Sequence, residues 1–148
     1  MMTPYRRVRI WTPMLLAAAL PIGCSPTADR IDPQGKTFDG VAPQDVVTLS
    51  GTEPFWTLVI DGGQAVWTTP DDQSGTRFAA QRFAGNNGLG FSGTLDGKPI
   101  AATLTPGECS DGMSDRQFPF VATVAWGDET YEGCGHTGAQ AFTGEGAS

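Results

Sequence analysis

The sequence has 148 residues, and its 16 Asp and Glu outnumber its 9 Lys and Arg, which gives a formal net charge of −7. An acidic chain repels the phosphate backbone, so no nucleic-acid partner is expected. The length suits one domain with a modest core. We predict neither a cofactor nor a metal centre, because there is no phosphate-binding glycine loop and His136 is the single histidine.

Residues 1–23 follow the order of a secretory signal peptide. Arg6, Arg7 and Arg9 give a positive start, and an apolar stretch over 10–22 follows. That stretch is too short to span a bilayer comfortably, since a spanning helix needs about 20 residues. We therefore predict export, with a short membrane anchor as the alternative interpretation.

Cys24 lies where bacterial lipoproteins are cleaved and acylated. The segment Leu20-Pro21-Ile22-Gly23-Cys24 resembles a lipobox, but Pro21 occupies the place of the usual leucine. Cleavage at an ordinary signal-peptidase site is therefore the alternative, and would give a soluble periplasmic or secreted protein. Acyl chains such as palmitate on Cys24 would anchor the chain stably. Ser25 in place of Asp favours, by the same resemblance, the outer membrane facing the periplasm over the inner membrane.

The chain after the signal peptide divides into three predicted parts. Residues 24–45 are rich in Pro and Gly without an apolar period, which predicts a flexible tether. Residues 46–136 form the predicted β-domain, and residues 137–148 a flexible tail. Loss of the three leading arginines changes the net charge from −7 to −10, so a cationic partner is favoured.

The β-domain is predicted from short β-branched and aromatic runs separated by turn signals. The clearest turns are Asp61-Gly62-Gly63, Asn86-Asn87-Gly88 and Asp96-Gly97. A long loop is expected from Pro106 to Pro119. The expected strands are, in chain order, 46–49, 55–60, 64–69, 76–83, 90–95, 100–105, 120–126 and 130–134.

These strands predict an all-β fold, a small antiparallel barrel of about eight strands, because closure removes exposed strand edges. A two-sheet β-sandwich is the alternative. Cys109 and Cys134 remain after export to an oxidising compartment, and we expect them to form one disulfide. That bond closes a loop of about 26 residues, worth on the order of 3 kcal/mol in the chain-entropy model.

Three sequence features carry a family resemblance. Residues 51–56 read GTEPFW, residues 109–119 read CSDGMSDRQFP, and a Gly-Cys pair follows at 133–134. Together they resemble a family of bacterial envelope lipoproteins and predicted membrane proteins with GTEPFW and CSDGMSDR-type motifs. In some members this domain is found beside META-type or lysozyme-inhibitor-type domains. The resemblance covers most of the β-domain, departs from the family at Gln117-Phe118-Pro119, and carries over no activity.

The first motif contributes Glu53, Pro54, Phe55 and Trp56 at the start of an expected strand. Pro54 fixes φ and removes a donor, so the strand begins with a bend. Phe55 and Trp56 then point to opposite faces, and at least one belongs to the core. We hypothesise that Glu53 forms a bidentate ion pair with Arg116 that fixes the long loop.

The second motif supplies the candidate binding residues Ser110, Asp111, Met113, Ser114, Asp115 and Arg116. Ser and Asp side chains cap nearby backbone N–H groups, so a disulfide-pinned structural loop is the simplest interpretation. Alternatively, a rigid loop presents a recognition surface with Met113 as an adaptable apolar contact. A calcium site at Glu108, Asp111 and Asp115 is disfavoured, because known calcium loops place ligands at alternate positions.

We therefore expect a non-enzymatic protein-binding module of the envelope, lysozyme-inhibitor-like at most, with a basic lysozyme as one candidate partner. The alternative is a lipocalin-like carrier in the periplasm. It needs an internal cavity, whereas Trp56, Trp67 and Trp126 are expected to fill the barrel. An enzyme is least supported. A triad of Ser114, His136 and an Asp lacks any flanking nucleophile motif, and His136 is expected after the last strand.

Overall fold

The computed structural model describes residues 38–144. The predicted signal peptide, the predicted lipidation of Cys24 and the first part of the predicted tether lie outside the described residues, as do residues 145–148. Within 38–144, no helix has the length and apolar character needed to cross a membrane.

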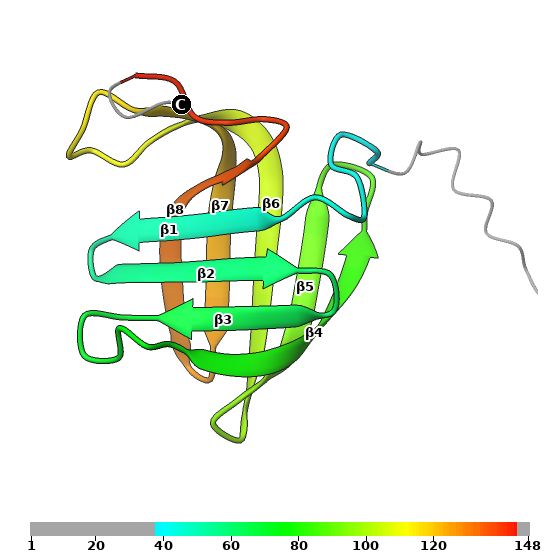
Figure 1. The fold of residues 1–148 in the computed structure, drawn as a ribbon, viewed down its shortest axis with the longest axis vertical. Helices are drawn as coiled ribbons and strands as arrows, with labels where there is room; N and C mark the ends of the chain where they lie inside the picture. Colours follow the sequence, from blue (N-terminus) through cyan, green and yellow to red (C-terminus); the bar gives the residue numbers. More distant parts are fainter. Residues whose placement is uncertain (1–37, 145–148) are drawn as a thin grey trace, which may run out of the picture. The chain divides into compact units, whose positions relative to one another are not determined.

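Eight antiparallel strands close into a barrel, in which each strand pairs with the next and β8 returns to pair with β1 (Figure 1). The predicted all-β barrel is confirmed and the sandwich alternative is wrong. The strands are β1 (Val47–Thr52), β2 (Phe55–Asp61), β3 (Gln64–Thr68), β4 (Thr76–Ala84), β5 (Leu89–Leu95), β6 (Lys98–Ser110), β7 (Gln117–Trp126) and β8 (Glu129–Thr137).

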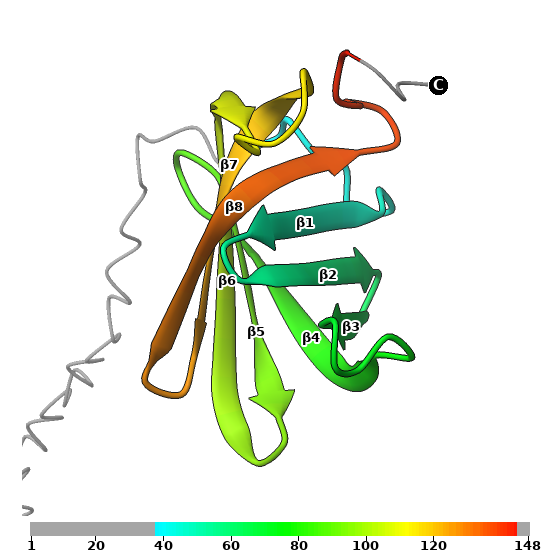
Figure 2. The ribbon, with the colours of Figure 1, turned by 90° about the vertical axis from the view of Figure 1, so that its left-hand side faces the viewer.

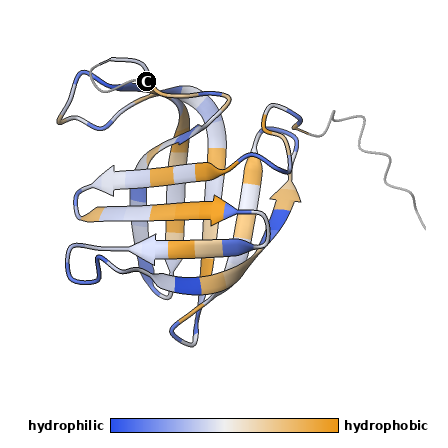
Figure 3. Cartoon of the chain, in the orientation of Figure 1, coloured by the Kyte–Doolittle hydropathy of each residue, from blue (hydrophilic) through white to orange (hydrophobic). Residues whose placement is uncertain are grey.

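Alternate residues of each strand face the barrel interior and form one apolar core, seen as orange bands on the strands in Figure 3. Phe55 is 52% exposed and Trp56 is 3% exposed, so the two do face opposite sides as predicted. The Trp56 and Trp67 rings stack with centroids 5.3 Å apart, and the Trp126 ring lies 6.1 Å from Trp67. Trp56 and Trp67 are therefore core residues, and the partly buried Trp126 packs against the core.

The packed domain is longer than the predicted 46–136. Val41 is 2% exposed and belongs to the core, and its carbonyl accepts a hydrogen bond of 2.7 Å from the Arg82 guanidinium. The Phe38 N–H donates to the Gly85 carbonyl at 2.7 Å. Residues 38–45 are therefore packed on the barrel and do not belong to a flexible tether, because one buried valine and these backbone contacts hold them.

The predicted long loop from Pro106 to Pro119 is also wrong, because β6 and β7 continue through most of it. A register shift between Pro106 and Cys109 accommodates the proline within the strand, and the ladder resumes with Cys109 opposite Phe118. The connecting turn spans only 111–116. Because such a shift bends a strand, the end of this hairpin bends away from the barrel wall at one end of the barrel (Figure 2).

This hairpin end packs on the outer side of β8. The β7–β8 ladder ends at Phe120 and Gly135, while β8 continues beside β1 up to Thr137. Inward and outward residues alternate along β8, so Cys134 and His136 point outward. Both are covered by the hairpin end, which places Cys109 against Cys134 and Phe118 against His136.

Candidate functional site

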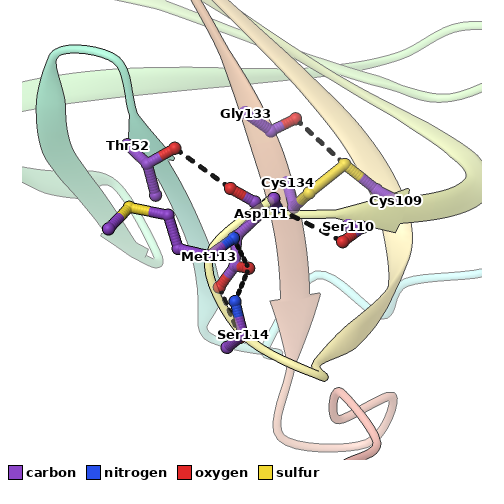
Figure 4. The surroundings of a disulfide bond; sticks show 9 residues. Thr52, Cys109, Ser110, Asp111, Met113, Ser114, Gly133 and Cys134 are labelled. Carbon is purple, nitrogen blue, oxygen red and sulfur yellow. Dashed lines mark hydrogen bonds between the residues drawn. A yellow bond between two sulfur atoms is a disulfide. The ribbon is translucent and has the colours of Figure 1, made fainter.

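The two sequence motifs meet at this end of the barrel. The Thr52 hydroxyl, at the end of β1, donates a hydrogen bond of 3.1 Å to the Asp111 carbonyl in the β6–β7 turn (Figure 4). The Glu53–Pro54 peptide bond between β1 and β2 is cis. We refer to residues 52–55 and 111–116 together as the paired turns.

The predicted disulfide between Cys109 and Cys134 is confirmed, with a Cα–Cα distance of 5.6 Å. Cys134 is 1% exposed although it points outward, because the hairpin end covers it. The Cys109 sulfur also lies 3.4 Å from the Gly133 carbonyl oxygen (Figure 4). The bond therefore fixes the base of the second turn to β8.

Replacing both Cys109 and Cys134 by Ala is expected to lower the free energy of unfolding by about 3 kcal/mol, because the unfolded chain gains the freedom that the closed loop removes. Urea unfolding followed by tryptophan fluorescence measures the loss. Reducing the wild-type disulfide should give a comparable loss and leave the double variant unchanged. A double variant as stable as the oxidised wild type would contradict the prediction.

Asp111 organises the second turn. One carboxylate oxygen accepts hydrogen bonds from the Met113 and Ser114 N–H groups at 3.0 and 2.9 Å, and the other accepts from the Ser114 hydroxyl at 2.7 Å. The Ser114 hydroxyl bond, followed by these backbone donors, lowers the pKa of Asp111. The capping that the sequence predicts is therefore present, and it holds the turn backbone in one conformation.

The predicted ion pair between Glu53 and Arg116 is not formed between these two described residues. Glu53 is exposed, whereas the Arg116 guanidinium carbon lies 4.7 Å from the centroid of the Phe142 ring. A cation over an aromatic face is attracted by the ring quadrupole. Phe142 lies in a stretch predicted to be flexible, so this contact of Arg116 could not be expected from the sequence.

A groove of about 590 Å³ opens beside the paired turns. Glu53 and Met113 line it from the two turns, and Val121 and Glu132 line it from β7 and β8. Of these, Val121 and Glu132 were missed by sequence analysis. The signal for Glu132 was its spacing of two residues from Cys134, which puts both on the same side of a strand.

Ser114 and His136, the two named residues of the possible catalytic triad, have different hydrogen-bond and packing partners. The Ser114 hydroxyl is bonded to Asp111, and no hydrogen bond joins Ser114 to His136 within the described chain. His136 lies in β8, not after the last strand as predicted, and contacts Phe118 and Phe142. Between residues 38 and 144, no three His, Cys, Asp or Glu side chains gather in a way that would hold a metal ion.

The fold and site define a closed eight-stranded barrel with a disulfide-pinned, self-capped turn at one end. No family model, curated protein or solved structure significantly matches the chain.

Proposed function

We propose that the chain is an exported envelope lipoprotein, anchored through Cys24, whose barrel presents the paired turns to a protein partner. We propose too that it belongs to the envelope family that its GTEPFW and CSDGMSDR segments resemble. The location that fits both proposals is the outer membrane, with the barrel in the periplasm.

The main support for the binding proposal is that Met113 is exposed on a turn whose backbone is held in place. Its side chain is 67% exposed, while the turn beneath it is held by the Asp111 hydrogen bonds, by Thr52 and by the disulfide. Phe55, on the neighbouring turn, is 52% exposed. Large apolar side chains on a preorganised surface contribute contact area without a large ordering cost on binding.

The charges around the groove favour a cationic partner. Glu53, Asp111 and Glu132 line the groove, and its lining residues include no Lys, Arg or His. The chain as a whole carries a net charge of −7. Opposite charge steers association and weakens as salt screens it. A basic lysozyme meets this requirement and is therefore the first partner to test.

The packing of the barrel gives less support to a lipocalin-like carrier. The space between the inward side chains of Leu58, Phe78, Phe91 and their neighbours is about 10 Å³, which is about the room that one water molecule needs. A carrier of a drug-sized ligand needs a pocket of at least about 300 Å³. We therefore propose that binding takes place on the outside of the barrel.

Binding of the chain to a basic lysozyme tests the proposal. Calorimetric titration at low and high salt should show an affinity that falls with salt. A variant with Met113→Ala and Glu132→Gln should bind about tenfold more weakly, a loss of about 1.4 kcal/mol. Both side chains are exposed, so the variant should fold normally.

The matched control is Phe83→Ala, which removes another exposed apolar side chain, 70% exposed, from β4. This control should bind like the wild type. Equal binding by the wild type, the double variant and the control would mean that the partner does not bind at the groove. No binding by the wild type would remove lysozyme as the partner.

A further inference from the structure

A short C-terminal segment fastens the base of the paired turns. Residues 138–144, which we call the C-terminal strap, follow β8 and turn back toward the start of β7. The Thr143 N–H donates to the Gln117 carbonyl at 2.9 Å, and the Gln117 N–H donates to the Thr143 carbonyl at 3.0 Å. The prediction of a flexible tail from residue 137 is therefore wrong for 137–144.

Aromatic packing holds the strap in place. The centroids of the Phe142 and Phe118 rings are 5.3 Å apart. The Arg116 guanidinium also lies over the Phe142 ring. At the strap's end, a Cβ built on Gly144 would lie only 2.4 Å from the Asp115 carbonyl oxygen. The strap therefore touches both Asp115 and Arg116, the last residues of the turn 111–116.

His136 lies beneath this strap. Its ring centroid is 5.9 Å from Phe118 and 5.2 Å from Phe142, and its plane is perpendicular to that of Phe142. The Nδ1 atom is buried and has no hydrogen-bond partner. A neutral imidazole with its proton on Nε2 fits this environment, because Nδ1 then has no N–H to satisfy.

A protonated imidazole fits poorly. Although the ring as a whole is only half-buried, its Nδ1–H would be a buried donor without an acceptor, which is unfavourable. The strap contains no charged residue, and Phe118 and Gln117 of β7 and Thr48 of β1, which pairs with His136, are uncharged. Among the described residues, Arg116 is a charged group that acts on His136. Burial first, and Arg116 second, lower the pKa of His136.

We propose that the C-terminal strap and His136 form a pH-sensitive latch that holds the base of the paired turns while the imidazole is neutral and opens when it is protonated. The latch is closed above the ordinary histidine pKa of 6.5 and loses stability as the pH falls below that value. Weaker partner binding in acid would follow only if the proposed function is right, whereas strap opening needs no partner.

The Thr143 and Gln117 amide protons report directly on the latch. Native-state hydrogen exchange of the full chain, followed by NMR between pH 7.5 and 4.5 and corrected for intrinsic rates, should show both amides losing protection together. The loss should be about tenfold for each unit by which the pKa of His136 is lowered. A core amide in β2 should keep its protection over the same range.

His136→Gln supplies the matched control, since it keeps a polar side chain of similar reach that does not titrate. Its strap amides should keep constant protection over this pH range. Phe142→Ala should expose both amides already at pH 7.5. Loss of protection in His136→Gln equal to that in the wild type, or no loss in the wild type, would overturn the latch.

The single histidine allows a second measurement that needs no variant. The His136 ring proton shifts should titrate below pH 6.5, with the same midpoint as the strap opening. A strap midpoint that differs from that of His136 would assign the opening to another group and overturn the proposal.

Discussion

Replacing Phe120 by Ala should lower the free energy of unfolding by about 3–5 kcal/mol, the range for removing a buried aromatic ring. Phe120 is 2% exposed and is the largest fully buried side chain of the core. It lies on β7 opposite Gly135, which has no side chain that could fill the space left by the removed ring. The loss is large compared with a total stability of about 5–15 kcal/mol. Urea unfolding followed by circular dichroism measures it.

Phe83→Ala is the control for this substitution. It removes the same side chain from an outward position of β4 that is 70% exposed, and it should change stability by less than about 0.5 kcal/mol. Similar losses for Phe120 and Phe83 would mean that the barrel interior is not packed as described.

The second large effect is expected for Gly133→Ala. A Cβ built on Gly133 would lie 2.1 Å from the Ser50 carbonyl oxygen and 3.0 Å from the Gly51 Cα. Both contacts are to the backbone of β1, so relief requires the β1–β8 ladder to move. We expect a loss of at least about 3 kcal/mol, the upper end for overpacked sites.

Gly138→Ala serves as its control, because nothing lies within 4 Å of a Cβ built there. The thermal midpoint of this variant should stay within a few degrees of the wild type. If Gly133→Ala were equally stable, β1 and β8 would not be in such close contact and the closing ladder would have to be revised.

The barrel itself was predictable because its information is local. Turn pairs such as Asp96-Gly97 mark hairpins, and Asp96 and Gly97 do adopt positive φ values of 49° and 75°. Alternation along the strand likewise predicted that Phe55 and Trp56 lie on opposite faces, as they do. In an up-and-down barrel each strand pairs with the next one, so finding the hairpins gives most of the topology.

The error at the β6–β7 hairpin has a physical cause. Pro106 and Gly107 are turn residues in most contexts, and a single sequence does not reveal that a register shift accommodates them within a strand. As a result, a predicted loop of 14 residues (106–119) became a turn of six (111–116).

The candidate site was predictable only in part. The Asp111 capping follows from residues within three positions of it, so the motif itself contained the information. The contact of Thr52 with Asp111 spans 59 positions and arises from the bend of the hairpin. The strap was missed because its interactions come from one aromatic residue and one pair of backbone bonds, which leave no periodic pattern.

Closure by β1 and β8 has a consequence for the order of folding. Their ladder joins Val47 to Thr137, so the residues it brings together span nearly the whole described domain, whereas the other seven ladders join neighbours along the chain. Its loop-closure entropy is therefore the largest, and it is expected to form last. Until β8 has been synthesised and has paired with it, β1 has an unpaired edge available to other chains. The period before closure is thus when the nascent protein most needs a chaperone.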